Sequence, residues 1–191
     1  MIYGRRFWRL ARSTLAALGF LAISGASATE LQRLDVSHAD GRYEVQADLL
    51  ITASVEAVYR LLTDYGNLAA LNPAITASEV IPAPPPFDVR VKTLIKACVA
   101  LYCQTLRRVE DVREGDGRLV ATIVPGQSDF RSGRAEWLLE ARGPDVLVQY
   151  RAELEPDFVV PPILGTLLIK QGLERELARM LANLERLARA S

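Results

Sequence analysis

The side chains best suited to chemistry in this sequence are two charged residues in a segment that otherwise has the pattern of a β-strand. Arg108 and Glu110 lie two positions apart in the segment 101–112, and residues two apart in a strand share one face of a sheet. If that face is the inner one, the two charges pair with each other or orient the polar group of a ligand. A β-bulge that returns both side chains to solvent is the competing interpretation.

A pair of cysteines is the second chemical feature. Cys98 and Cys103 flank the tip of an expected hairpin between the strands 88–99 and 101–112. Facing residues of antiparallel strands are close enough for a disulfide, and an isolated pair in a secreted chain is expected to be oxidised. Redox motifs have two intervening residues, whereas four separate these cysteines. The pair therefore predicts a structural disulfide that holds the hairpin tip in shape.

The disulfide also indicates which face of the hairpin points inward. Cys98 shares its strand face with three cationic side chains, which marks that face as the outer one: Arg90, Lys92 and Lys96. If Cys103 lies on the outer face as well, Arg108 and Glu110 point inward. An inward arginine and glutamate would be polar groups inside an otherwise apolar tunnel.

Several kinds of chemistry are missing from the sequence. It contains no glycine-rich phosphate loop, no nucleophile-elbow serine and no cysteine–histidine cluster at metal-ligand spacing. His38 is the only histidine and is expected to be a solvated residue near a turn. We therefore expect no metal and no cofactor, and any acid–base catalysis must use carboxylates, tyrosine or lysine.

The first 28 residues have the composition of a secretory signal. Four arginines and no acidic residue are followed by an apolar run over 15–23 and by small residues ending at Ala28. An uncleaved anchor is the alternative, and Arg5-Arg6 hints at a twin-arginine signal. Cleavage near Ala28 leaves 19 basic and 23 acidic side chains, a net charge of about −4. We expect a periplasmic or secreted protein without the basic surface that nucleic-acid binding requires.

The rest of the chain is mostly strand-like until its end. Asp40-Gly41 between two alternating segments predicts a hairpin, and Ser54 is suited to cap a short helix. The remaining expected strands are 78–81, 88–99, 101–112, 118–124, 134–141 and 146–154. The final segment 161–190 has a leucine-rich stripe at helical spacing and a charged opposite side that includes Glu176. This pattern predicts a long amphipathic helix that lies on the sheet, and a coiled coil is the alternative.

A family resemblance rests on short motifs along this order of elements. The matching pieces are 51–59 (ITASVEAVY), 62–65 (LTDY), 71–73 (LNP), 133–137 (GRAEW) and 181–184 (LANL). They resemble the START-like superfamily, and within it the polyketide cyclase/dehydrase and coenzyme-Q-binding groups. The resemblance implies one α+β domain over 29–191 with a helix-grip fold, in which a curved antiparallel sheet wraps the C-terminal helix around an apolar tunnel.

The same resemblance implies a function and a set of tunnel-lining residues. We expect binding, transport or sensing of a lipid or quinone-like molecule without catalysis. The alternatives are a cyclase/dehydratase-type enzyme using Arg108, Glu110 or Tyr150, and a module that contacts a membrane or a protein. The residues expected to line the tunnel come from four strands and the helix: Val91, Ile95, Arg108, Glu110, Trp137, Leu139, Tyr150, Leu173, Leu177 and Met180.

Two apolar segments lie where turns and helix starts are usually polar. They are 99–102, at the hairpin tip, and 158–164, before the final helix. We expect them either to form a doorway through which a lipid passes during transient membrane contact, or to fold onto the protein's own core.

Overall fold

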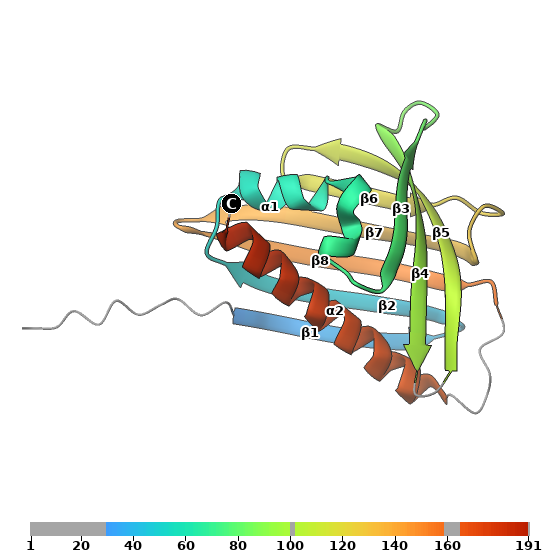
Figure 1. The fold of residues 1–191 in the computed structure, drawn as a ribbon. Coiled ribbons are helices and arrows are strands. Elements are labelled where there is room, and N and C mark those ends of the chain that lie inside the picture. The colour runs from blue at the N-terminus through green and yellow to red at the C-terminus, as the bar shows by residue number, and fades with distance from the viewer. Residues whose placement is uncertain (1–29, 100–101, 159–164, 191) are drawn as a thin grey trace, which may run out of the picture.

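The computed structural model describes residues 30–99, 102–158 and 165–190 (Figure 1). The expected signal segment 1–28 lies outside the described residues. Two helices, one 3₁₀ helix and eight strands are present in the described part of the chain. In order they are β1 (Glu30–Ala39), β2 (Arg42–Ile51), α1 (Val55–Leu62), the 3₁₀ helix η1 (Tyr65–Ala70), β3 (Ile75–Ile81), β4 (Val89–Val99), β5 (Tyr102–Gly115), β6 (Arg118–Ile123), β7 (Phe130–Arg142), β8 (Asp145–Pro156) and α2 (Gly165–Arg189).

The described strands form one antiparallel sheet in the order β1-β2-β8-β7-β6-β5-β4-β3. The sheet curves, and α2 runs across its concave face, from the ends of β4 and β5 towards α1 (Figure 1). The helix contacts β1, β4 and α1. This is the helix-grip architecture expected from the sequence, and the coiled-coil alternative is wrong because the apolar side of α2 faces its own sheet.

The first hairpin follows from its turn residues. Asp40 and Gly41 both have positive φ angles, 51° and 78°, and a two-residue turn of this kind matches the twist of the strands that it joins. In β2 the odd-numbered residues from Tyr43 to Ile51 are buried, whereas their neighbours are at least partly exposed. This alternation is the period-2 pattern of a strand with one face in the core.

Helix α1 begins as its capping residue predicts. The Oγ of Ser54 accepts a hydrogen bond from the backbone N–H of Ala57 at 3.1 Å, which satisfies one of the unpaired donors of the first turn. Val58 is fully buried against the main core. The cap and the buried face together fix this short helix on the sheet.

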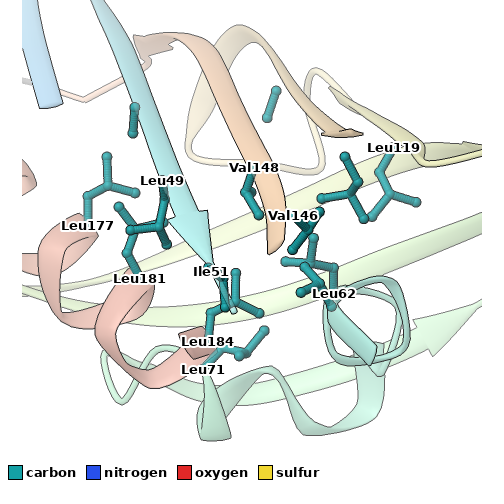
Figure 2. Packing of buried hydrophobic residues seen from close by; sticks show 14 of the residues in the cluster. Leu49, Ile51, Leu62, Leu71, Leu119, Val146, Val148, Leu177, Leu181 and Leu184 are labelled. Atoms are coloured by element: carbon teal, nitrogen blue, oxygen red, sulfur yellow. The ribbon is translucent and has the colours of Figure 1, made fainter. Parts of the chain in front are cut away.

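The core lies between α2 and the concave face of the sheet. Leu177, Leu181, Leu184 and Ala188 recur at spacings of four and three along α2, and each is at least nine-tenths buried. They pack against β2 and β8 residues such as Ile51 and against the loop residue Leu71 (Figure 2). The Nδ2 of Asn183 donates to the backbone oxygen of Leu71 at 3.0 Å, which ties the helix to the segment after η1.

Element boundaries differ from expectation at one strand in particular. The segment between the expected strands 118–124 and 134–141 is shorter than expected, because β7 begins at Phe130. The preceding residues are held against β5 by side-chain hydrogen bonds. Ser128 donates from its Oγ to the oxygen of Val109 at 3.0 Å and accepts from the N–H of Val109 at 2.9 Å.

None of the described helices combines the length and the apolar character that a membrane-spanning helix needs.

Candidate ligand-binding site

Strands β4 and β5 place Arg108 and Glu110 on the concave face of the sheet. In their register Glu110 faces Val91 and Arg108 faces Thr93, with no shift along the pairing. Val91 is 3% exposed and Thr93 1%, so this face of both strands points into the protein. The β-bulge interpretation is therefore wrong, and the two charged side chains point inward.

Arg108 and Glu110 form an ion pair in this interior. The Nε of Arg108 lies 3.0 Å from the Oε2 of Glu110, and their side chains are 22% and 10% exposed. The Nε is buried, yet it has no hydrogen-bond partner in the described part of the chain. A buried donor without a hydrogen-bond partner is costly, so the Nε has hydrogen-bonding capacity that the described residues do not use.

The aromatic side chains of β7 and β8 form the neighbouring wall. Trp137 and Tyr150 face each other in the strand register, and their ring centroids are 4.2 Å apart with the planes tilted by 38°. Burial raises the pKa of the Tyr150 phenol to about 12, while the charge of Arg108 lowers it and that of Glu110 raises it. The phenol is therefore a neutral hydrogen-bond donor at physiological pH, within electrostatic reach of the ion pair.

Helix α2 supplies the opposite wall. Leu173 and Met180 are partly buried against the main hydrophobic cluster, which also contains Leu177 and, from β7, Leu139. Leu177 and Leu139 are 8% and 6% exposed, so they belong to the packed core more than to an open surface. Trp137 and Tyr150 are partly buried against the same cluster, which brings six of the expected lining residues together.

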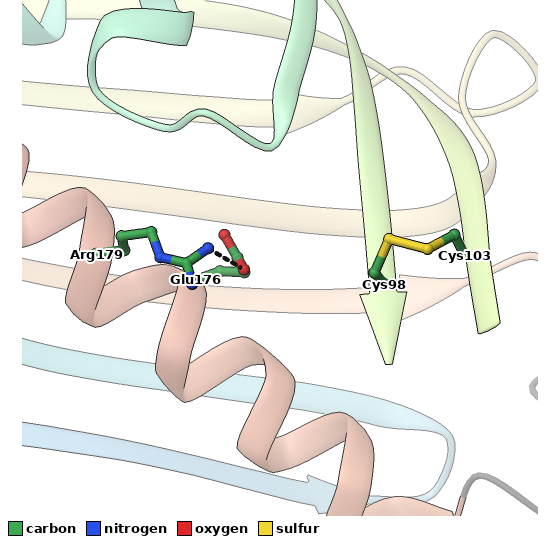
Figure 3. The surroundings of a disulfide bond; sticks show 4 residues. All are labelled: Cys98, Cys103, Glu176 and Arg179. Carbon is green, nitrogen blue, oxygen red and sulfur yellow. Dashed lines mark hydrogen bonds and ion pairs between the residues drawn. A yellow bond between two sulfur atoms is a disulfide. The ribbon is translucent and has the colours of Figure 1, made fainter. Parts of the chain in front are cut away.

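Glu176 departs from its expected place on the solvated side of α2. One carboxylate oxygen, Oε1, accepts a hydrogen bond from the Nη1 of Arg179 at 3.0 Å, as Figure 3 shows. The other, Oε2, is buried without a hydrogen-bond partner in the described residues. Glu176 lies at the edge of the apolar stripe of α2, and at such positions helical periodicity does not show whether the side chain faces the core or the solvent.

Two hydrophobic clusters lie beside the polar residues. The main cluster covers β2, β8 and α2, and a smaller cluster is built on Leu106, Ile123 and Phe130. Glu110 faces Ile123 of the smaller cluster in the strand register. Arg108 and Glu110 both act electrostatically on the phenol of Tyr150, which packs against the main cluster. The ion pair therefore adjoins both apolar regions, on the face of β4 that also carries Val91, Thr93 and Ile95. Thr93 was not among the expected lining residues, and only its register opposite Arg108 identifies it.

The expected disulfide is confirmed. Cys98 faces Cys103 in the strand register, the two are bonded, and their Cα atoms are 4.1 Å apart. Both residues are exposed on the outer face, and the bond spans β4 and β5 just before the hairpin tip (Figure 3).

The expected doorway falls largely outside the described residues. Of its two segments, the tip 100–101 and the stretch 159–164 are not described. Phe158 is described, and its ring meets that of Phe130 edge-on with centroids 6.1 Å apart. It packs against the smaller cluster. The doorway stays a prediction.

A hollow of about 170 Å³ lies on the outer face of the sheet over β2, β8 and β7. Its lining is mostly charged or polar: Glu44, Gln46, Arg134, Glu136, Arg151 and Glu153, with Val45 and Ala152. Charged side chains of both signs on an open surface are well solvated. This hollow offers an apolar molecule little surface to bury, so we place the candidate site on the concave face.

The concave face brings polar and apolar groups together. It offers guanidinium donors, a carboxylate acceptor and a neutral phenol donor, surrounded by apolar and aromatic side chains. Small-molecule sites commonly combine an apolar lining with a few polar groups that fix orientation. No group of three His, Cys, Asp or Glu residues in the described ranges is arranged to hold a metal ion.

Solved structures with the same fold cover nearly the whole described domain. A START superfamily protein from Mycobacterium smegmatis is 16% identical, with a TM-score of 0.62 over 77% of this chain and 97% of that one. The Zhui aromatase/cyclase from Streptomyces sp. R1128 is 13% identical, with a TM-score of 0.61 over 78% and 94%. A STAR-related lipid transfer protein from Xanthomonas axonopodis is 17% identical, with a TM-score of 0.57 over 79% and 98%. These likenesses show a START-like helix-grip fold.

A sequence-family comparison adds to the structural one. No curated protein matches the sequence. The model of a family described as "Polyketide cyclase / dehydrase and lipid transport" matches residues 42–189, which include all described elements after β1. The chain belongs to the polyketide cyclase / dehydrase and lipid transport family.

Proposed function

We propose that this protein binds a hydrophobic small molecule, of lipid or quinone-like character, between the concave face of the sheet and α2, and carries or senses it without changing it. The observation that carries the proposal is the inward-facing ion pair of Arg108 and Glu110, which adjoins Tyr150 and two apolar clusters. A polar group inside an apolar wall is costly to maintain for stability alone. It is useful where a ligand's polar group must be oriented.

In this proposal the tunnel walls are the expected residues. Aromatic contact comes from Trp137 and Tyr150, and aliphatic contact comes from β4 and α2. The family description and the lipid-transfer and cyclase relatives support a hydrophobic ligand. We also propose that a signal peptide over 1–28 is removed near Ala28, so that the domain 29–191 acts in the periplasm or outside the cell.

Binding can be tested with Nile red, an uncharged fluorescent dye that emits strongly in apolar surroundings. We expect saturable binding of one dye per protein. Ile95 faces inward and Leu94 is its neighbour on the outer face. Ile95→Trp should therefore fill the tunnel and lower dye affinity at least tenfold, whereas Leu94→Trp should leave it within twofold. Absence of saturable binding in the unaltered protein would refute the proposal, as would equal effects of the two variants.

An enzyme of the cyclase/dehydratase type is the second candidate. The neutral phenol of Tyr150 close to the carboxylate of Glu110 favours it, because a proton donor and an acceptor on one surface are what acid–base catalysis needs. If turnover of a hydrophobic substrate is found by mass spectrometry, Tyr150→Phe and Glu110→Gln should each lower it at least tenfold, about 1.4 kcal/mol of barrier. Unchanged turnover in both variants would remove them as catalytic residues.

A further inference from the structure

The two described ion pairs that contain a buried polar atom without a hydrogen-bond partner are each locally neutral. On the sheet, Arg108 is matched by Glu110 at 3.0 Å. On α2, Glu176 is matched by Arg179 at 3.0 Å. No uncompensated cation is available on these described walls to neutralise an anionic ligand. A ligand carboxylate beside Glu110 would instead meet a like charge in a poorly solvated place, which disfavours ionisation of both groups.

The hydrogen-bond donors of the site, unlike its charges, are not all paired within the described residues. The Nε of Arg108 is a buried donor without a partner in the described residues. The phenol of Tyr150 keeps its proton, because burial raises its pKa. Two donors near one another require an acceptor atom, and an uncharged oxygen supplies one without adding charge.

We propose that the ligand of this site is an uncharged apolar molecule with a hydroxyl or carbonyl oxygen, and that Glu110 discriminates against carboxylates. The inference rests on the proposed hydrophobic-ligand function and adds the chemical class of the ligand. Arg108 donates to the ligand oxygen, and Glu110 keeps the arginine in place while repelling an anionic head group. Removal of the Glu110 charge leaves Arg108 uncompensated and converts the site into one that favours anions.

The test compares ligands of one chain length that differ in the head group. 1-Decanol, 2-decanone and decanoate each compete with Nile red for the full-length protein at pH 8, where decanoate is ionised. We expect decanol and decanone to displace half of the dye at concentrations at least tenfold below that of decanoate. Any apolar site disfavours an ion to some degree, so the decisive quantity is the change in the decanoate-to-decanol ratio caused by a variant.

The variant and its control lie at adjacent positions of β5. Glu110→Gln should shift the ratio at least tenfold towards decanoate. Asp111→Asn is the control, because Asp111 also pairs with an arginine, Arg90, at 2.6 and 2.8 Å, but on the other face of the sheet. It should leave the ratio within twofold. If Glu110→Gln does not fold, as judged by circular dichroism, Arg108→Gln replaces it and should shift preference at least tenfold from decanol towards decylammonium.

The outcomes distinguish failure of the uncharged-ligand assignment from failure of the proposed function. Equal displacement by decanoate and decanol, or an equal ratio in Glu110→Gln and Asp111→Asn, would overturn the assignment of an uncharged ligand while leaving hydrophobic binding intact. An unshifted decylammonium preference in Arg108→Gln would do the same. Failure of Nile red to bind the unaltered protein would instead overturn the proposed function itself.

Discussion

Replacement of Trp137 by alanine should change ligand binding more than the loss of stability alone can explain. Trp137 lies on the inner face of β7, stacks on Tyr150 at 4.2 Å and is partly buried against the main cluster. Leu139 is two residues along the same strand and on the same face, but it is 6% exposed and part of the packed core. The two positions therefore distinguish a wall of the proposed tunnel from the core.

The expected losses of stability are similar. Truncation of a fully buried tryptophan costs about 3–5 kcal/mol. Trp137 is less than fully buried, so its loss should be about 2–3 kcal/mol, of which about 0.5–1.5 kcal/mol is the stacking on Tyr150. Leu139→Ala removes a smaller side chain from a closed environment and should cost about 3 kcal/mol, within the usual range for such sites.

Urea unfolding measures the stability of both variants, and Nile red titration measures binding. We expect Trp137→Ala to change dye affinity at least fivefold, because it removes one wall of the proposed tunnel. Leu139→Ala should leave the affinity within twofold at a comparable loss of stability. If both variants change affinity equally, or if Trp137→Ala costs less than about 1 kcal/mol, the division between wall and core is wrong.

Three further predictions concern the frame around the site. Replacement of both Cys98 and Cys103 by serine should lower the free energy of unfolding by about 2 kcal/mol in urea, since the disulfide closes a short loop and both cysteines are exposed; an unchanged value would mean that it does not constrain the unfolded chain. Leu184→Ala should lower the free energy of unfolding in urea by about 2–5 kcal/mol, because Leu184 is fully buried. Leu167 is 65% exposed, so Leu167→Ala should change that free energy by no more than about 0.5 kcal/mol. Equal losses in the two variants would contradict the observed packing of α2. The folded protein holds the Tyr150 proton up to a pKa of about 12 and the unfolded chain up to about 10. Stability from this group is therefore complete below pH 10 and is lost as pH rises to 12, so unfolding at pH 9 and 11 should show a smaller decrease for Tyr150→Phe than for the unaltered protein.

The fold could be predicted from the sequence because its signals are local and regular. Asp40-Gly41 specifies its turn through backbone conformation, and Ser54 caps its helix through one hydrogen bond. The stripe on α2 specifies which side of the helix is buried. Period-2 alternation and the cysteine pair together gave the correct inward face for Arg108 and Glu110, although they are charged.

The start of β7 and the environment of Glu176 could not be predicted in the same way. Phe130 begins its strand because Ser128 and neighbouring residues bond to β5, and such contacts join segments about 20 residues apart. Glu176 is charged and at the edge of a helical stripe, so its buried oxygen depends on how α2 lies against the sheet. Thr93 has an ordinary strand pattern, and only the register with β5 brings it opposite Arg108.

Native mass spectrometry of the protein, purified without detergent, tests the central claim most directly. A bound hydrophobic molecule should appear as added mass that is lost when the protein is denatured. The released molecule should be uncharged and should contain oxygen, and Ile95→Trp should abolish the added mass while Leu94→Trp retains it. A spectrum with the polypeptide mass alone, unchanged after incubation with 1-decanol, would contradict the account.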